Sequence, residues 1–292
     1  MENLRGAMLM VLAMAGFALE DMCIKFLSGS LPAGQILMIL GAGGAAVFGA
    51  VCVVQGRRLF PRAMLRAPLL LRNASEAIGT IAFVTAITLI DLSVASAILQ
   101  ATPLVVTLGA ALFLGEDVGW RRWSAILVGF AGVLVIIRPG FEGFVPASLF
   151  AILGMLCLAL RDLATRRVTA DISSVQVSFQ AFLMVIPAGA VLLQYAGGDL
   201  APVDIESAVV LLAAVGIGLV AYLLIVTAMR IGEVSFVTPF RYSRMIFALA
   251  IGMAVFGERP DAATWAGMGI IMGSGLYTLW RERRVRQRPS AA

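Results

Sequence analysis

The sequence predicts an all-α membrane protein with ten transmembrane helices arranged as two inverted five-helix repeats. The composition supports this class, because 61% of the 292 residues are hydrophobic, only 13% are charged, and the mean hydropathy is +0.98. A soluble domain of this length needs a larger polar surface. Apolar runs of roughly 17–25 residues, long enough to span a bilayer, recur along the whole chain. The second half also repeats the first at a spacing of about 141 residues.

The apolar runs place the helices in order along the chain. They cover 5–27, 34–55, 68–89, 93–114, 121–138, 146–166, 174–196, 207–230, 234–256 and 262–281. The first run resembles a secretory signal in its position, but it carries Glu20 and Asp21 near its end and lacks a small-residue cleavage pattern. The connections are short and leave no soluble domain. We expect a first repeat over 1–140, a second, inverted repeat over 141–281, and a basic cytoplasmic tail over 282–292.

The repeat is carried by matched residues at corresponding points of the two halves. Ala18, Leu19, Asp21, Thr85, Ala86, Ser93, Gly115, Glu116 and Trp123 recur as Ala159, Leu160, Asp162, Thr227, Ala228, Ser235, Gly257, Glu258 and Trp265. The later matches mark helix starts, a Gly-Glu pair at a helix end and the following Trp. Chance similarity of apolar segments is the alternative explanation. Two halves with an odd number of helices lie inverted in the bilayer, an architecture typical of secondary transporters.

Arginine side chains indicate how the chain is oriented in the membrane. When the connections are numbered alternately from the N-terminus, one side receives most of the arginines, including Arg57, Arg121 and the C-terminal tail. The other side receives Arg138 and Arg259 together with most of the loop acidic residues. Because cytoplasmic loops carry an excess of basic residues, we expect a multi-pass protein of the cell inner (plasma) membrane with both termini in the cytoplasm. The tail is expected to be a solvated, topology-setting end attracted to anionic lipid.

Two stretches of the first half resemble a known family. The stretch from Ser93 to Glu116 reads SVASAILQATPLVVTLGAALFLGE, and the stretch from Arg122 to Gly140 reads RWSAILVGFAGVLVIIRPG. Both resemble the signature of the drug/metabolite transporter superfamily, and the whole chain is similar to its EamA-type ten-helix branch. In the second half, TPFRYSR at 238–244 departs from the Ala-rich pattern. Within the branch the chain looks most like the YddG-type amino-acid exporters, whereas related members are uptake carriers for other metabolites.

Ionisable side chains inside the apolar runs are the first candidates for function. Such groups are expected to face a partner or a wet cavity, because lipid exposure is costly. Asp21 with Lys25 and Arg72 with Glu76 have i,i+4 spacing on one helix face. For groups near a predicted helix end, a structural ion pair is the favoured interpretation. These groups are Asp21, Lys25, Arg161 and Asp162.

Glu76 and Arg244 differ from these because each lies roughly midway through its predicted helix. A carboxylate and a guanidinium at similar depth suit a zwitterion, since one meets the ammonium group and the other the carboxylate. A direct structural pair between Glu76 and Arg244 is the alternative. Any proton coupling is expected to run through Glu76, because the chain contains no His.

Polar and aromatic residues on four helix faces extend this candidate site. Helical spacing places them on common faces that line a central cavity, with ordinary helix packing through small and polar residues as the alternative. The candidate substrate-binding residues are Phe17, Glu76, Gly79, Thr80, Phe83, Ser96, Gln100, Tyr222, Thr238, Tyr242 and Arg244. Pro103 and Pro239 are candidate gating residues, because proline frees backbone carbonyls within a helix. The glycine-rich faces are expected to form close-packed scaffold, with Gly41, Gly44, Gly129, Gly132, Gly269 and Gly273 as their members.

The sequence favours transport over catalysis. It lacks His, a metal-ligand set, a nucleophile-base pair and a nucleotide-binding loop, so we expect no metal, no cofactor and no ATP-driven pump. The three cysteines lie in apolar runs and do not form a disulfide framework. We expect a secondary transporter that exports aromatic or apolar amino acids through a central cavity by alternating access. An uptake carrier for another small metabolite is the alternative, and a membrane-embedded enzyme is less favoured. The expected partners are a small-molecule substrate and the lipid bilayer, with no nucleic acid.

Overall fold

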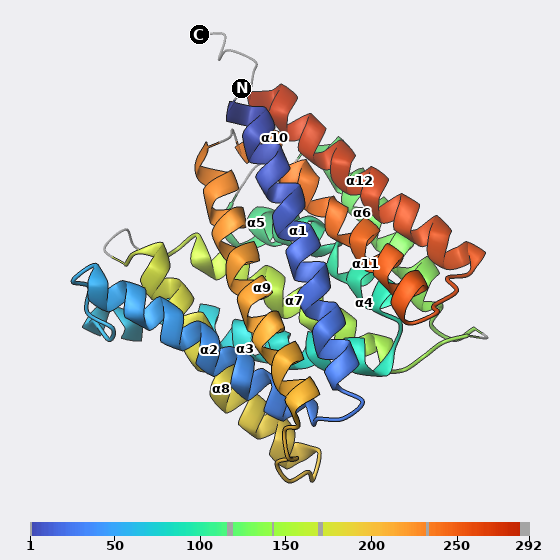
Figure 1. The fold of residues 1–292 in the computed structure, drawn as a ribbon. Helices are drawn as coiled ribbons and strands as arrows, with labels where there is room; N and C mark the ends of the chain where they lie inside the picture. Colours follow the sequence, from blue (N-terminus) through green and yellow to red (C-terminus); the bar gives the residue numbers. More distant parts are fainter. Residues whose placement is uncertain (1, 116–118, 142, 169–171, 232–233, 287–292) are drawn as a thin grey trace. The chain divides into compact units, whose positions relative to one another are not determined.

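The structure is a computed structural model that describes residues 2–115, 119–141, 143–168, 172–231 and 234–286 (Figure 1). These residues are helical apart from turns and short connections, and they contain no strand. The helices are α1 (Glu2–Leu27), α2 (Ala33–Val54), η1 (Arg62–Leu65), α3 (Ala67–Leu89), α4 (Leu92–Leu99), α5 (Thr102–Phe113), α6 (Trp120–Ile137), α7 (Ser148–Thr165), α8 (Ser174–Tyr195), α9 (Ile205–Ile231), α10 (Val234–Val237), η2 (Thr238–Tyr242), α11 (Ser243–Val255) and α12 (Ala262–Arg286). Each predicted apolar run is therefore helical.

Seven helical segments among the described residues are long and apolar enough to cross a membrane. They are α1, α2, the α4–α5 segment, α6, α7, α8 and α9. The other three predicted runs fold as α3, as α10 to α11, and as α12. Helix α3 differs in composition because it carries Arg72, Asn73 and Glu76 within its length. The all-α membrane architecture is thus present, while the count of ten spans and their inverted arrangement remain predictions.

The chain folds into two compact units that cut across the predicted halves. The α6–α12 unit comprises Met1–Leu19, Ile90–Ser148 and Ile217–Ala292, and the α2–α8 unit comprises Glu20–Leu89 and Leu149–Gly216. Helices α1 and α9 each contribute residues to both units. Each unit therefore combines helices from the first and second predicted repeats.

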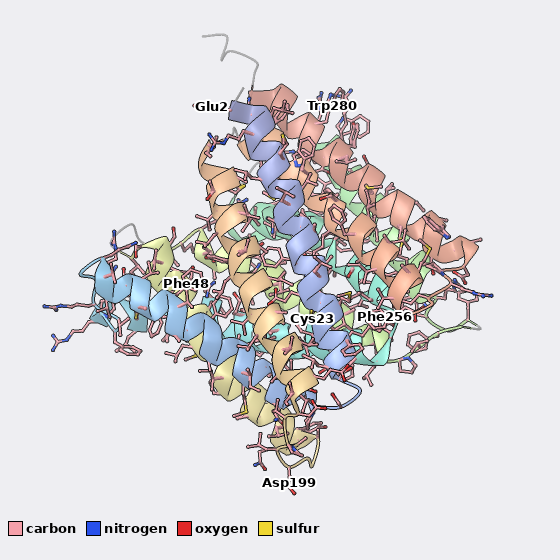
Figure 2. The ribbon with its side chains drawn as sticks, viewed as in Figure 1. Glu2, Cys23, Phe48, Asp199, Phe256 and Trp280 are labelled. Atoms are coloured by element: carbon pink, nitrogen blue, oxygen red, sulfur yellow. The ribbon has the colours of Figure 1, made fainter. Side chains whose placement is uncertain are left out.

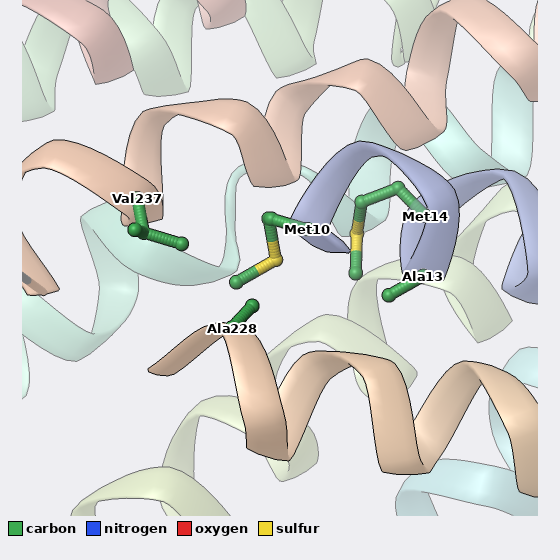
Figure 3. Close-up of a cluster of buried hydrophobic side chains, with 5 residues drawn as sticks. All are labelled: Met10, Ala13, Met14, Ala228 and Val237. Carbon is green, nitrogen blue, oxygen red and sulfur yellow. The ribbon is translucent and has the colours of Figure 1, made fainter. Parts of the chain in front are cut away.

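In the α6–α12 unit, methionine side chains of α1 fill a buried core. Met10, Ala13 and Met14 pack with Ala228 of α9 and Val237 of α10, and Met10 reaches between the last two residues (Figure 3). Unbranched methionine side chains fill irregular gaps of this kind well. Phe17 is among the partly buried residues that pack against the same cluster. This core holds the N-terminal half of α1 against α9 and α10.

Glycines allow α6 and α12 to approach closely. A Cβ atom at Gly132 would lie 3.0 Å from the carbonyl oxygen of Gly267, so the two backbones meet there. The expected scaffold role of Gly129 and Gly132 is confirmed. For Gly269 and Gly273 it is wrong, because a Cβ atom at either position would meet nothing within 4 Å. The face of α12 that packs on α6 passes through Gly267, and residues two and six positions further along lie outside that contact.

In the α2–α8 unit, α2 lies along α8 (Figure 1). Gly34 and Gly189 bring the two backbones together, since a Cβ atom at either would collide with the other helix. Phe48, labelled on α2 in Figure 2, stacks on Phe182 of α8 with ring centroids 5.5 Å apart. Helices α3 and α7 also pack closely, because a Cβ atom at Gly154 would lie 3.2 Å from the backbone nitrogen of Phe83.

Candidate functional site

The predicted run 93–114 is interrupted, and it forms two helices separated by Gln100 and Ala101. Pro103 lies in the first turn of α5, where its missing N–H group leaves the carbonyl of Leu99 without its usual donor. The hydroxyl of Thr102 donates to that carbonyl instead, and the hydroxyl of Thr107 donates to the carbonyl of Pro103 at 2.9 Å. Pro103 therefore marks the start of α5, and the regular helical hydrogen bonding is broken at Gln100 and Ala101, just before it.

The predicted run 234–256 is interrupted in the same way. It begins as the single turn α10, tightens into the 3₁₀ segment η2 with Pro239 in its first turn, and resumes as α11 at Ser243. In the register that pairs Ser93 with Ser235, Gln100 pairs with Tyr242, so the two interruptions occupy corresponding points of the repeat. Interrupted helices at corresponding positions of two repeats are the usual sign of a substrate site in a transporter.

The two interruptions contact each other within the α6–α12 unit. The side-chain nitrogen Nε2 of Gln100 donates to the backbone carbonyl of Arg241 at 2.9 Å. The hydroxyl of Ser243 donates to the carbonyl of Phe240 at 2.7 Å. Side chains thus add hydrogen bonds to backbone carbonyls that also accept from the N–H group of Ser243. The contact ties the predicted residue Gln100 to the backbone of Arg241, the residue before Tyr242.

A cation and an aromatic ring lie beside these interruptions. Arg244 is the second residue of α11, and its guanidinium carbon lies 5.4 Å from the ring centroid of Phe17 on α1. A guanidinium over an aromatic face is an attractive arrangement. The edge of a guanidinium plane, in contrast to its face, has the fork geometry that matches a carboxylate. The α6–α12 unit therefore joins two predicted site residues that are more than two hundred positions apart in the sequence.

Two buried hydroxyl groups accompany this arrangement. Ser96 lies one turn before Gln100 on α4 and is 1% exposed, and Tyr242 at the end of η2 is 3% exposed. Among the described residues, neither hydroxyl has a hydrogen-bond partner. Gly275 of α12 leaves the space that the Tyr242 hydroxyl occupies, because a Cβ atom there would collide with it. Buried polar groups without partners are rare, and they are retained where a ligand or a water molecule completes them.

A carboxylate from a distant loop caps the first half of this broken helix. Glu258 accepts hydrogen bonds from the backbone N–H groups of Leu92 and Ser93 at 2.6 and 3.0 Å, and from the Ser93 hydroxyl at 2.7 Å. Asp91, which stands at the N-cap position, makes no side-chain cap bond. Gly252 leaves room for the Glu258 carboxylate. The connection after α11 is thereby tied to the start of α4.

Four charged residues of the α2–α8 unit form a second cluster around Glu76. The predicted i,i+4 pair is confirmed, with Arg72 donating to Glu76 at 3.1 Å. Arg161 of α7 donates to the other carboxylate oxygen at 3.0 Å and also pairs with its neighbour Asp162 at 2.8 Å. The expected structural pairing of Arg161 and Asp162 is therefore present. Two cations and two anions compensate one another in this cluster.

Amide side chains extend the Glu76 cluster to α8. Asn73 accepts from Arg72 at 3.0 Å and donates to Gln180 at 3.1 Å, and both amide residues are 7% exposed. This network ties α3 to α8 and α7 through polar contacts. Glu76 and Arg244 belong to different units, and the ion-pair partners described for Glu76 are arginines of its own unit.

The remaining candidates have varied surroundings. Gly79 and Phe83 pack against α7, where a Cβ atom at Gly79 would lie 3.1 Å from Cβ of Cys157. Thr80, Tyr222 and Thr238 are half-buried on α3, α9 and η2. Glu116, expected at the end of a helix, lies outside the described residues, as do 287–292 of the expected tail.

Sequence reasoning missed Arg161 as a partner of Glu76 and Glu258 as the cap of α4. The repeat held a signal for the second, because Ser93 and Glu258 both occupy matched positions of the two halves. No comparable signal linked Arg161 to Glu76, since the two lie on different helices and their spacing carries no helical period.

Comparison with known proteins agrees with this organisation. The sequence profile of the EamA-like transporter family matches residues 4–138 and again residues 145–280. A riboflavin transporter from Rhizobium johnstonii is 28% identical over 76% of this chain and 72% of its own length. An S-adenosylmethionine uptake transporter from Rickettsia bellii is 26% identical over 70% of this chain and 67% of its own length.

A pseudopaline exporter from Pseudomonas aeruginosa is 27% identical over 96% of this chain and 97% of its own length. A solved crystal structure shares the fold with a TM-score of 0.63 and 18% identity, covering 98% of this chain and 99% of that one. The family profile matches nearly the whole chain, and the relatives are transporters and not enzymes. The chain therefore belongs to the EamA-like transporter family.

Proposed function

We propose that this transporter moves small metabolites that carry a carboxylate. The substrates that we favour are amino acids with apolar or aromatic side chains, and the proposed direction is export. The arrangement of Arg244 over Phe17 carries this proposal. A guanidinium binds a carboxylate through paired hydrogen bonds. An adjacent ring packs against an apolar or aromatic side chain. Arg244 follows the interruption of a helix and contacts Phe17 of α1 there. Transporters of this architecture bind substrates at such interruptions.

The polar groups around the interruptions support a small polar substrate. Ser96 and Tyr242 present buried hydroxyls that lack a partner among the described residues, so an ammonium or carboxylate group of a substrate can complete them. Together with the Arg244 guanidinium, these hydroxyl groups suit an anionic group better than a cation.

Transport by alternating access is part of the proposal. The two interrupted helices, joined by Gln100 and Arg241, are the elements that change conformation, and Pro103 and Pro239 set the places where they bend. Proton coupling, where it operates, runs through Glu76, whose carboxylate is held by Arg72 and Arg161. Uncoupled facilitated diffusion is the competing outcome.

The relatives favour a second candidate function, which is uptake of a larger metabolite. Two of them are named as riboflavin and S-adenosylmethionine transporters. Both of those compounds contain a flat ring system suited to Phe17. S-adenosylmethionine also carries an amino-acid carboxylate, so it satisfies the same groups as the first candidate.

Transport into proteoliposomes tests these alternatives directly. Purified protein is reconstituted, and uptake of radiolabelled phenylalanine, leucine, alanine, S-adenosylmethionine and riboflavin is measured with and without an imposed proton gradient. The proposal expects saturable transport of phenylalanine and leucine that exceeds that of alanine. Transport of riboflavin alone, which has no carboxylate, would contradict it. Protein-free liposomes and the Arg244→Gln variant are the controls.

A further inference from the structure

A pocket separate from these sites lies between the beginning of α6 and the middle of α12. Its volume is about 360 Å³, and its walls include Trp120, Arg121, Ser124 and Val128 of α6 with Gly273 and Tyr277 of α12. All of these residues belong to the α6–α12 unit. None of the proposed transport residues lines it.

The chemistry of the walls is basic and aromatic. The Arg121 guanidinium carbon lies 5.0 Å from the ring centroid of Trp120, and both residues are exposed. The ring of Tyr277 lies 5.9 Å from that of Trp280, which Figure 2 labels toward the end of α12. Among the described residues that line the pocket, none is acidic. Tryptophan and tyrosine concentrate at the level of lipid headgroups, and arginine binds phosphate.

Two further features favour an anion at this position. Helix α6 begins at Trp120, and its N-cap residue Gly119 has no side chain that could accept hydrogen bonds from the first N–H groups of the helix. Arg281 follows Tyr277 by four residues on α12 and therefore lies on the same helix face. The predicted orientation places this end of both helices at the cytoplasmic surface, where anionic lipids are concentrated.

We propose that this pocket binds the headgroup of an anionic phospholipid of the cytoplasmic leaflet. The phosphate is held by Arg121 and the start of α6, the rings of Trp120 and Tyr277 flank the glycerol region, and an acyl chain runs down the exposed side of Val128. The volume accommodates a headgroup and not a whole lipid, so the chains remain in the bilayer. A second copy of this chain is the competing occupant.

Glycines of α12 provide a matched pair of variants. A Cβ atom at Gly273 would meet nothing within 4 Å, and the same holds at Gly269 one turn earlier, outside the pocket walls. Gly273→Leu fills the pocket without a backbone clash, whereas Gly269→Leu adds the same side chain elsewhere. Arg121→Gln removes the cation, and Arg57→Gln removes an exposed arginine that is remote in the sequence and belongs to the other unit.

Native mass spectrometry of the full chain, released from vesicles of equal phosphatidylglycerol and phosphatidylcholine, measures the lipid retained by each variant. The wild type is expected to retain phosphatidylglycerol selectively. Arg121→Gln should lower that retention by about fivefold, which is the effect of one basic side chain near an anionic surface. Gly273→Leu should also lower it by about fivefold because the leucine side chain fills the pocket. The controls Arg57→Gln and Gly269→Leu should match the wild type.

Equal retention of the two lipids by the wild type would overturn the proposal. Unchanged retention in Arg121→Gln would also overturn it, as would a dimer that Gly273→Leu dissociates. A thermal unfolding scan of each variant identifies any loss of lipid that follows from loss of fold. If Gly273→Leu proves unstable, the result for Arg121→Gln decides the outcome alone, because Arg121 is exposed and its substitution does not disturb the core.

Discussion

At the scale of single residues, the face and the edge of the Arg244 guanidinium suit different partners. Its position over Phe17 is held by a cation–π contact, which is worth about 0.5–1 kcal/mol at an exposed site and more when desolvated. A substrate carboxylate makes charge-assisted hydrogen bonds that are stronger than this contact. Substrate binding therefore need not displace the ring, because the face and the edge of the guanidinium are used separately.

Arg244→Lys tests the edge of the guanidinium. Lysine keeps the charge but cannot donate in the planar fork that a carboxylate matches. We expect the KM for phenylalanine to rise about tenfold, which is the loss of one hydrogen bond to a charged group, while the thermal unfolding temperature stays near that of the wild type. Arg241→Lys, three residues earlier in the chain, is the matched control. Full transport activity in Arg244→Lys would count against a carboxylate clamp.

Glu76 allows a second test at this scale. Its side chain is 13% exposed and pairs with two arginines, so Glu76→Gln leaves an uncompensated positive charge in the cluster. Breaking a buried ion pair from one side costs about 3–5 kcal/mol. The double variant Glu76→Gln with Arg72→Gln restores charge balance, and its unfolding temperature should recover much of the loss. A double variant less stable than Glu76→Gln would show that charge compensation is not the main role of Glu76.

The i,i+4 spacing predicted the Arg72–Glu76 pair, because helix geometry alone brings such residues together. The partnership of Glu76 with Arg161 could not be predicted, since it depends on how α3 and α7 pack. The proposed zwitterion site assigned Glu76 and Arg244 to one substrate. The structure describes arginine partners for Glu76 within its own unit, so its part in substrate binding remains a prediction.

At the scale of helices, the apolar runs predicted where each element lies but not where two of them break. Hydropathy gives no sign of a break at Gln100, which is a single polar residue in an apolar stretch. The stretch TPFRYSR at 238–244 is more polar than its surroundings, but hydropathy alone does not show where the helix breaks within it. The prolines did carry such a sign, because a proline in the first turn of a helix marks a helix start. The glycines of α12 show a similar limit. Periodicity indicates which residues share a face of α12, but only packing determines which face meets α6. That face contains Gly267 and not Gly269 or Gly273.

The start of α4 offers a test of capping across elements. Glu258 accepts three hydrogen bonds there, so Glu258→Gln should lower the stability of the protein by about 1–2 kcal/mol through loss of the charged acceptor. Thermal unfolding in detergent measures the change. Glu206→Gln, an exposed acidic residue in the first turn of α9, should have little effect. Equal shifts for the two variants would argue against a specific cap.

Asp261, in the connection before α12, makes a contribution to stability that depends on pH. A side-chain hydrogen bond from Arg138 holds the pKa of Asp261 well below its usual range, and the N–H group of Thr264 adds to this by donating to the carboxylate. A carboxylate with a lowered folded-state pKa contributes stability above its unfolded pKa of about 3.9 and loses it as the pH falls through the folded value. Asp261 is half exposed, so solvent screening makes this contribution small.

Asp261→Asn keeps the helix cap and removes only the charge, because asparagine is an equally good N-cap residue. The unfolding temperature of the wild type should exceed that of Asp261→Asn at pH 7. The difference should shrink steadily as the pH is lowered below about 4. A difference that grows under acid conditions would contradict the sign of this argument.

At the scale of the whole molecule, the repeat in the sequence and the units in the structure divide the chain differently. The family profile matches the chain twice, in consecutive halves. The compact units instead take α1, α4 to α6 and α9 to α12 for one, and α1 to α3 with α7 to α9 for the other. Interleaving of this kind is expected of an inverted repeat, in which corresponding helices of the two halves pair with each other. Helix α2 pairs with α8 and α6 with α12 in this way.

The inverted arrangement makes a prediction about two loops. Arg57 follows α2, and Asp199, labelled in Figure 2, follows α8 at the corresponding point of the repeat. If each half contains five spans, five crossings separate the two residues, and they lie on opposite sides of the membrane. If α3, with its Arg72 and Glu76, does not cross, four crossings separate them and they share a side. The loop containing Arg57 is expected in the cytoplasm because it is rich in arginine.

Single-cysteine labelling in intact cells distinguishes these arrangements. Cys23, Cys52 and Cys157 are first replaced by serine or alanine, and Arg57→Cys or Asp199→Cys is then introduced. A membrane-impermeant maleimide should label Asp199→Cys in intact cells, and Arg57→Cys only after the membrane is permeabilised. Labelling of both in intact cells, or of neither, would remove the basis for two inverted halves. The reverse pattern would keep the inversion and place the arginine-rich face, with the proposed lipid pocket, on the outer side of the membrane.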